Sequence, residues 1–185
     1  MHTANRLLAA AVTAALALNS ASSRAADQTS AQAATWQQHH EILTFRAYTS
    51  EYTCDGIRSK VREILLYLGA RRDDLKIVVS GCGPSEFPTG GLAPINVEFS
   101  TLAVTSDASQ ASVVPGHWTQ TKILPRSPNF IDAGDCELIA QMRQLLSTDF
   151  AWQNLDYKAL CTPHDVSVNS FELQGLVLKM SRGAS

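Results

Sequence analysis

The four cysteines constrain the fold of this chain more than any other feature of its sequence. They are Cys54, Cys82, Cys136 and Cys161, and the separations within the first and second pairs are 28 and 25 residues. An even number of cysteines in an exported protein is typical of disulfides. Because four cysteines allow three pairings, the choice depends on the elements that lie between them.

The amino terminus predicts that the chain is exported. Residues 1–26 have the parts of a secretory signal peptide: the positive charge of Arg6, an apolar run over residues 7–18 and small residues before the cleavage site. Cleavage fits after Ala25 or Ala26, and a competing site lies just upstream. An uncleaved anchor is the alternative, but the apolar run is shorter than the roughly 20 residues that span a bilayer. We therefore expect a soluble exported protein, periplasmic in a cell with two membranes.

Hydrophobic periodicity predicts a strand, a helix and two strands in the first half of the chain. Residues 27–40 have no periodicity and are interpreted as a flexible leader. Thr53 is typical of a helix N-cap, and the apolar stripe that follows it ends at Gly69, a typical helix C-cap. The expected elements are a strand over 41–48, a helix over 54–68, and strands over 75–80 and 95–104.

The same order of elements returns in the second half. Asp135 is expected to cap a helix whose apolar stripe runs from Leu138 to Leu146. Gly175 is expected to interrupt the last strand. The strands of this half are predicted over 117–124, 155–161 and 171–178.

This order predicts an α+β fold of two pseudo-repeats, 41–105 and 116–180, within a single domain over 41–185. The expected architecture has two layers, with a mainly antiparallel sheet that carries two helices on one face. Its tandem βαββ units have the split βαβ character of ferredoxin-like folds. Because such folds host many unrelated activities, the architecture predicts no function.

The lengths of the predicted elements favour one disulfide pairing. A helix of about 14 residues rises roughly 21 Å from its first cysteine. A returning strand of about 7 residues covers roughly 23 Å. The two cysteines of each pseudo-repeat therefore finish at the same end of the unit. The sequence thus predicts the disulfides Cys54–Cys82 and Cys136–Cys161.

Charge and composition narrow the classes of function. Without residues 1–26, the chain has 13 basic and 17 acidic residues, a net charge of −4. This mild negative charge disfavours nucleic acid as a partner. No segment after the signal peptide is apolar for long enough to cross a membrane. The sequence contains no recognisable catalytic or cofactor motif, so neither a catalytic residue nor a cofactor is predicted.

Two alternatives give the cysteines and histidines a chemical role. Cys161-Thr-Pro-His164 has a spacing seen in zinc sites, and His39-His40 is a second pair of candidate ligands. A closed zinc site needs three or four converging ligands, which oxidised cysteines cannot supply. Cys54 and Cys136 lie near predicted helix N-termini, where the helix dipole favours a thiolate, but the Cys-x-x-Cys motif of thiol–disulfide enzymes is absent.

Four short runs of the chain resemble a group of short exported proteobacterial proteins. The resemblance extends over most of the mature chain and implies export, a core with paired cysteines and a host with two membranes. The group has no assigned activity, so the resemblance implies no catalytic residue. The runs are Tyr52-Thr-Cys54-Asp-Gly56, Leu68-Gly-Ala-Arg71, Gly134-Asp-Cys136-Glu-Leu138 and Cys161-Thr-Pro-His164.

Taken together, these features favour a non-enzymatic domain that binds a protein or an envelope component. A metal-binding protein and a thiol–disulfide protein are the alternatives. The open edges of a small sheet would be natural docking places, by strand addition. Aromatic residues gather near the first strand and in the second pseudo-repeat, where most are expected in the core and a few exposed ones could make a binding surface. They are Trp36, Phe45, Tyr48 and Tyr52, and Trp118, Phe130, Trp152 and Tyr157.

Overall fold

The computed structural model describes residues 31–49, 51–84, 86–107 and 112–180. Residues 1–26, predicted as the signal peptide, lie outside the described residues. The strands are β1 (Gln32–Arg46), β2 (Lys76–Val79), β3 (Leu92–Val104), β4 (Val114–Ile123), β5 (Trp152–Thr162) and β6 (Asp165–Met180). The helices are α1 (Cys54–Leu68), α2 (Cys136–Gln141) and α3 (Arg143–Thr148), with short 3₁₀ turns η1 (Thr89–Gly91) and η2 (Ala133–Asp135).

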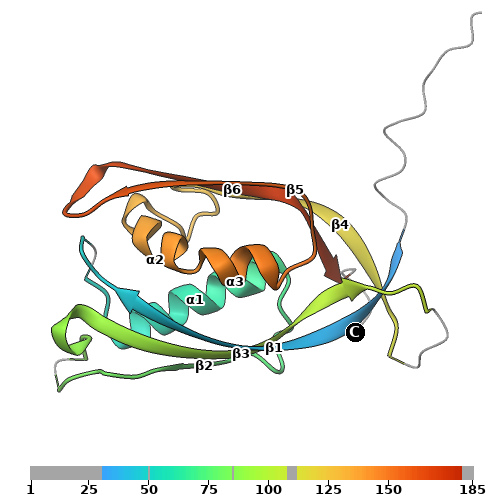
Figure 1. The fold of residues 1–185 in the computed structure, drawn as a ribbon, viewed down its shortest axis with the longest axis horizontal. Helices are drawn as coiled ribbons and strands as arrows, with labels where there is room; N and C mark the ends of the chain where they lie inside the picture. Colours follow the sequence, from blue (N-terminus) through green and yellow to red (C-terminus); the bar gives the residue numbers. More distant parts are fainter. Residues whose placement is uncertain (1–30, 50, 85, 108–111, 181–185) are drawn as a thin grey trace, which may run out of the picture.

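The strands form one six-stranded antiparallel sheet in the order β2-β3-β1-β4-β6-β5, so the predicted α+β class with an antiparallel sheet is confirmed. β1 and β4 pair only between residues 32–34 and 114–116, a contact we call the junction. The sheet folds over there, and β1, β2 and β3 face β4, β5 and β6 (Figure 1).

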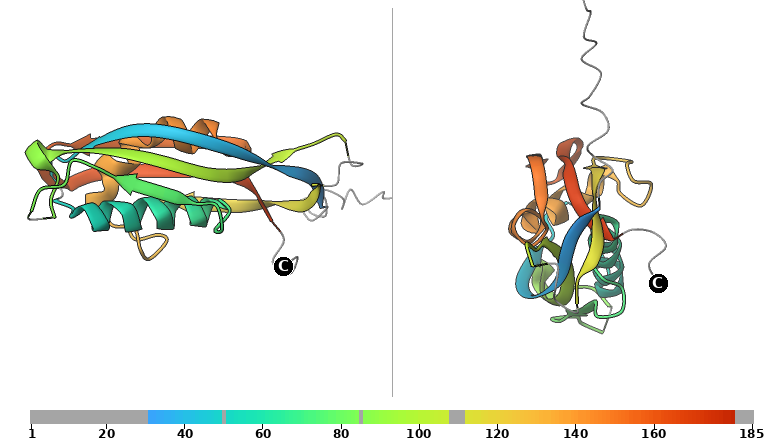
Figure 2. Two further views of the ribbon diagram at one scale, coloured as in Figure 1. Left: turned by 90° about the horizontal axis from the view of Figure 1, so that it is seen from below. Right: turned by 90° about the vertical axis from the view of Figure 1, so that its right-hand side faces the viewer.

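The helices fill the space between the two halves of the sheet. Figure 1 shows all three helices there, so they lie on the inner face of the sheet. Seen from below, α1 runs along one margin and α2 and α3 along the other (Figure 2). The section through the molecule is therefore sheet, helices and sheet, which differs from the expected two layers.

One hydrophobic core joins the two halves. The predicted stripe of α1 is fully buried, and the same core cluster includes Phe45 of β1, Leu138 of α2 and Leu173 of β6. Both predicted caps of α1 are present. The Thr53 side chain accepts a hydrogen bond from the Gly56 N–H, and Gly69 ends the helix with a φ of 102°, where glycine is favoured.

Three local predictions differ from the structure. Residues 32–40 of the predicted leader belong to β1, which pairs with β3 from Ala34 to Arg46. The helix expected after Asp135 is divided at Met142 into α2 and α3, and the Asp135 side chain makes no capping hydrogen bond to α2. Asp132 instead caps the preceding turn η2, where it accepts a hydrogen bond from the Gly134 N–H. β6 runs without a break through Gly175, where an added Cβ would lie 3.0 Å from the Gln153 carbonyl oxygen.

Candidate functional site

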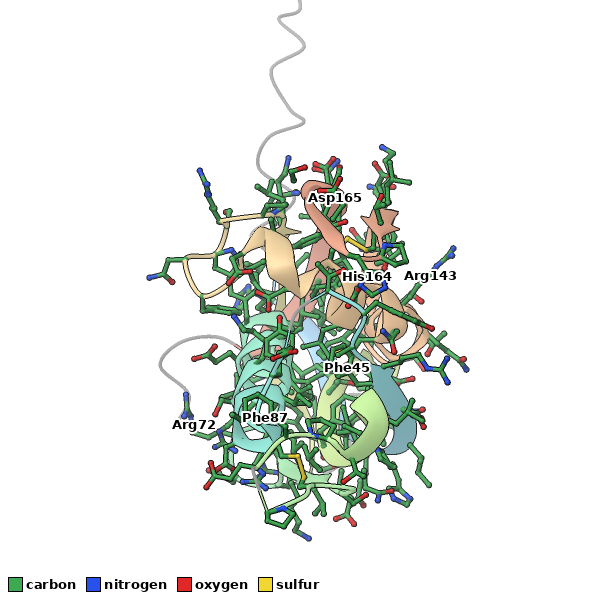
Figure 3. All side chains as sticks on the ribbon, turned by 90° about the vertical axis from the view of Figure 1, so that its left-hand side faces the viewer. Phe45, Arg72, Phe87, Arg143, His164 and Asp165 are labelled. Carbon is green, nitrogen blue, oxygen red and sulfur yellow. A yellow bond between two sulfur atoms is a disulfide. The ribbon has the colours of Figure 1, made fainter. Side chains whose placement is uncertain are left out.

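Three connecting segments meet at the end of the molecule far from the junction, which we call the distal end. They are the β1–α1 loop (described over 47–49 and 51–53), the β2–β3 loop (described over 80–84 and 86–91) and the β5–β6 turn (163–164). Figure 3 shows this end face-on, with Phe87 on the β2–β3 loop and His164 in the β5–β6 turn. One end of each of five strands, β1, β2, β3, β5 and β6, and the start of α1 thus converge on one surface.

Both disulfides brace the distal end. They join Cys54 to Cys82 and Cys136 to Cys161, with Cα–Cα distances of 6.3 and 5.6 Å, and this is the pairing that the element lengths predict. Cys54–Cys82 links the start of α1 to the residues just beyond β2, and Cys136–Cys161 links the start of α2 to the end of β5. The Cys54 N–H also donates a 2.8 Å hydrogen bond to the Glu86 carbonyl, so the first two loops are fastened together.

A buried carboxylate fixes the β1–α1 loop. Glu137, in the first turn of α2, is only 4% exposed. Its Oε2 accepts hydrogen bonds from the N–H groups of Tyr48 and Thr49 at 2.9 and 3.1 Å, and its Oε1 accepts one from the Thr49 hydroxyl at 2.8 Å. The Thr49 hydroxyl oxygen in turn accepts a 2.7 Å hydrogen bond from the His164 N–H. The loop is therefore tied to α2 and to the β5–β6 turn.

A second buried carboxylate holds the other end of this loop. Asp135 is fully buried and accepts hydrogen bonds from the Tyr52 hydroxyl, from Lys60 Nζ at 3.0 Å and from the Asp132 N–H at 2.8 Å. Burial, and then the hydrogen bond to Asp135, raise the pKa of Tyr52 well above its ordinary value of 10.0. Tyr52 therefore stays neutral at physiological pH and acts as a hydrogen-bond donor.

The fixed loops surround an aromatic pocket of about 300 Å³, which we call the distal pocket. Tyr48 and Phe87 are 43% and 40% exposed. Arg46 Nη1 donates a hydrogen bond to the Tyr48 hydroxyl at 3.3 Å, and Arg46 is itself held by two main-chain hydrogen bonds with the Gln141 side chain. The pocket is lined by Ala47, Tyr48, Thr49, Glu51, Tyr52, Phe87, Pro88 and Gly91. Its size and aromatic walls suit one large apolar or aromatic side chain.

The two edges of the sheet are poorly suited to docking by strand addition, which the sequence analysis expected there. β2, at one edge, has only four residues. β5, at the other edge, has register irregularities after Gln153 and after Leu160, and Asn154 has a φ of 54°. Short and bulged edge strands are devices that discourage pairing with another chain. The structure therefore favours the distal end over the edges as a docking place.

The three candidate metal-ligating histidines are separated. His39 Nε2 lies 2.9 Å from the Thr101 hydroxyl and its ring stacks on Phe99 at 5.1 Å, whereas His40 is exposed. His164 lies in the β5–β6 turn, and the neighbouring Cys161 is oxidised. Within residues 31–49, 51–84, 86–107 and 112–180, no group of three or more His, Cys, Asp or Glu side chains is arranged to hold a metal ion.

Two residues of the distal end escaped the sequence analysis. Glu137 looks like an ordinary helix-dipole acid, and only its position beside the apolar Leu138 and Ile139 hints that it is buried. Phe87 lies in a loop rich in glycine and proline, where a large aromatic residue is itself a signal of exposure. Tyr48 and Tyr52 are among the eight aromatic residues noted in the sequence, most of which were expected in the core.

Comparisons with known proteins give no relative. No family model, curated protein or solved structure matches the chain. The two disulfides fit a protein of an oxidising compartment. In the part of the chain that the structure describes, every helix is too short or too polar to cross a membrane.

Proposed function

We propose that this protein is a periplasmic binding domain whose distal end recognises a partner polypeptide through Tyr48 and Phe87. The observation that carries the proposal is the pairing of two exposed aromatic side chains with loops that are held rigidly. Aromatic side chains are the residues that most often dominate protein interfaces. Loops ordered before binding lose little entropy on association, which favours affinity.

The polar groups of the distal end support binding rather than catalysis. Asp135 and Glu137 are buried, and their hydrogen bonds are made to other groups of the same chain. The Tyr52 hydroxyl donates its hydrogen bond to Asp135, and burial raises its pKa, which disfavours its ionisation. Asp135 and Glu137 thus fix the loops around the distal pocket, and neither of them lines it.

Export to the periplasm agrees with two features of the chain. Residues 1–26 have the pattern of a signal peptide, and the two disulfides require an oxidising compartment to form and persist. The resemblance to short exported proteobacterial proteins points to the same compartment.

An internal duplication would explain why both disulfides brace the same end. The order β1-α1-β2-β3 is followed by β4, the helices α2 and α3, β5 and β6. The strand order also reads symmetrically outward from the junction, since β1, β3 and β2 lie on one side and β4, β6 and β5 on the other. We include this origin in the proposal, with one half supplying most of the distal pocket and the other anchoring its loops.

Site-specific photocrosslinking in the cell envelope tests the proposed function. A photoreactive phenylalanine replaces Tyr48, Phe87 or, as the control, Ile42, which is 69% exposed on the outer part of β1. We expect positions 48 and 87 to crosslink to the same polypeptide and position 42 to give no such adduct. Mass spectrometry of the adducts identifies the partner.

Two results would contradict the proposal. Adducts with the same partner at position 42 and at neither distal position would place the interface on the outer sheet face. The absence of a common adduct at positions 48 and 87, with all three proteins exported and oxidised, would leave the distal end without a protein partner.

A further inference from the structure

A second groove, of about 760 Å³, lies near the junction, and we call it the basic groove. It is separated from the distal pocket by the length of α1, whose 15 residues rise about 22 Å. The groove adjoins the carboxyl end of α1, and its lining includes Trp36, Tyr67, Arg71, Arg72, Val114 and Lys179. Nothing in the proposed function uses it.

The charges of the basic groove are mostly positive. Arg71, Arg72 and Lys179 line it, and Asp73 is the one carboxylate among its described lining residues. This local excess of positive charge contrasts with the net charge of −2 for the whole chain. The local excess of positive charge therefore attracts an anion to the groove.

Arg71 is held in position by an aromatic ring. Its guanidinium carbon lies 5.6 Å from the centre of the Trp36 ring. A cation over an aromatic ring is attracted to its electron-rich face, and the guanidinium of Arg71 carries five N–H donors. The contact with Trp36 therefore helps to order the Arg71 side chain at the groove.

Lys179 has a structural role at the wall of the groove. Its Nζ donates a 2.6 Å hydrogen bond to the Tyr67 carbonyl and lies 4.8 Å from the centre of the Tyr67 ring. A cation at the last turn of a helix interacts favourably with the helix dipole. Lys179 therefore contributes positive charge, whereas the arginines are better suited to contact a ligand directly.

We propose that the basic groove binds an anionic amphiphile, that is, a carboxylate or phosphate carried on an aliphatic chain. The guanidinium forks of Arg71 and Arg72 match the two oxygens of such an anion. Trp36 and Val114 provide apolar surface for the chain. The volume lies within the range of small-molecule sites, about 300–1,000 Å³.

Tryptophan fluorescence measures this binding directly, because Trp36 lies in the groove. The intact oxidised protein is titrated with monomeric dodecanoate and dodecyl phosphate below their micelle concentrations. Neutral dodecyl maltoside and acetate, which lack the charge and the chain respectively, are the comparison ligands. We expect saturable changes with the two anionic amphiphiles only, and we expect them to disappear in Trp36→Phe.

The arginines supply the decisive variants. Figure 3 shows Arg72 and Arg143 projecting from opposite margins of the molecule. Arg143 also makes a cation–π contact, with its guanidinium carbon 5.2 Å from the centre of the Tyr157 ring, so Arg143→Gln is a matched control. We expect the double variant Arg71→Gln/Arg72→Gln to weaken dodecanoate binding by about tenfold or more, the size expected for a lost charge-assisted hydrogen bond. Arg143→Gln should bind like the unaltered protein.

Three outcomes would overturn the inference. Equal binding of dodecyl maltoside and dodecanoate would indicate an unspecific apolar surface. Unchanged affinity in the double arginine variant would remove the arginines from the site. Arginine-dependent sedimentation with phosphatidylglycerol vesicles, without binding of the monomers, would make the groove a membrane-docking surface instead. None of these results bears on crosslinking at Tyr48, so this inference and the proposed function fail separately.

Discussion

Replacement of Glu137 tests whether a buried carboxylate holds the β1–α1 loop. Glu137→Ala removes the acceptor of three hydrogen bonds, two from main-chain N–H groups and one from the Thr49 hydroxyl. A buried donor left without a partner costs about 1–3 kcal/mol. Because Tyr48 is 43% exposed and water can reach this loop, we take the lower value for each donor. The expected loss in the free energy of unfolding is about 3 kcal/mol.

Glu137→Gln separates the charge from the shape of this side chain. The amide oxygen can accept from both main-chain N–H groups, and the amide NH₂ can donate to the Thr49 hydroxyl oxygen. Only the strengthening of these bonds by charge is lost, so we expect a cost of about 1 kcal/mol. The ratio of the two losses is therefore the informative quantity.

Urea denaturation of the oxidised protein gives the free energy of unfolding of each variant, and hydrogen exchange gives the protection of the amides of Tyr48 and Thr49. Glu63→Ala, at an exposed position of α1, is the control and should change stability by less than about 0.5 kcal/mol. Equal losses for Glu137→Ala and Glu137→Gln, or unchanged protection of the two amides in Glu137→Ala, would refute the reasoning.

Three further predictions concern the same end of the molecule. Cys54→Ala/Cys82→Ala opens a loop with a separation of 28 residues and should lower the midpoint of urea denaturation by the equivalent of about 3.5 kcal/mol. Asp135→Asn leaves the Lys60 ammonium without its carboxylate and should cost about 3 kcal/mol in calorimetry, part of which Lys60→Met should restore. In the folded protein the pKa of Tyr52 is raised above 10.0, so the stabilisation from this group is complete below that pH and should be lost as the pH rises further. Tyr52→Phe should reduce this loss when unfolding is measured as a function of pH.

Local patterns in the sequence predicted those elements whose structure is set by nearby residues. The helix α1 has its cap residue, its stripe and its terminal glycine within one continuous segment, and all three act as predicted. The disulfide pairing followed from the lengths of a helix and a strand, which are also local quantities.

Features that depend on distant residues were not predictable in this way. Residues 32–40 are a strand because β3 lies beside them, and their own sequence, in which Trp36 stands among Ala, Gln, Thr and His, shows no alternation of apolar and polar residues. The fold at the junction depends on one short contact between β1 and β4. Glu137 is a binding partner of the β1–α1 loop only because the fold brings together residues 88 positions apart.

The affinity of the crosslinked partner for the oxidised protein, measured by calorimetry, tests the central claim most directly. Tyr48→Ala and Phe87→Ala should each weaken binding by about thirtyfold, the usual effect of removing an aromatic anchor. Ile42→Ala, at an exposed apolar position outside the distal pocket, should leave the affinity within about twofold, as expected for a residue outside the interface. A large loss in Ile42→Ala together with unchanged affinity in the two distal variants would contradict the proposal that the distal end is the binding site.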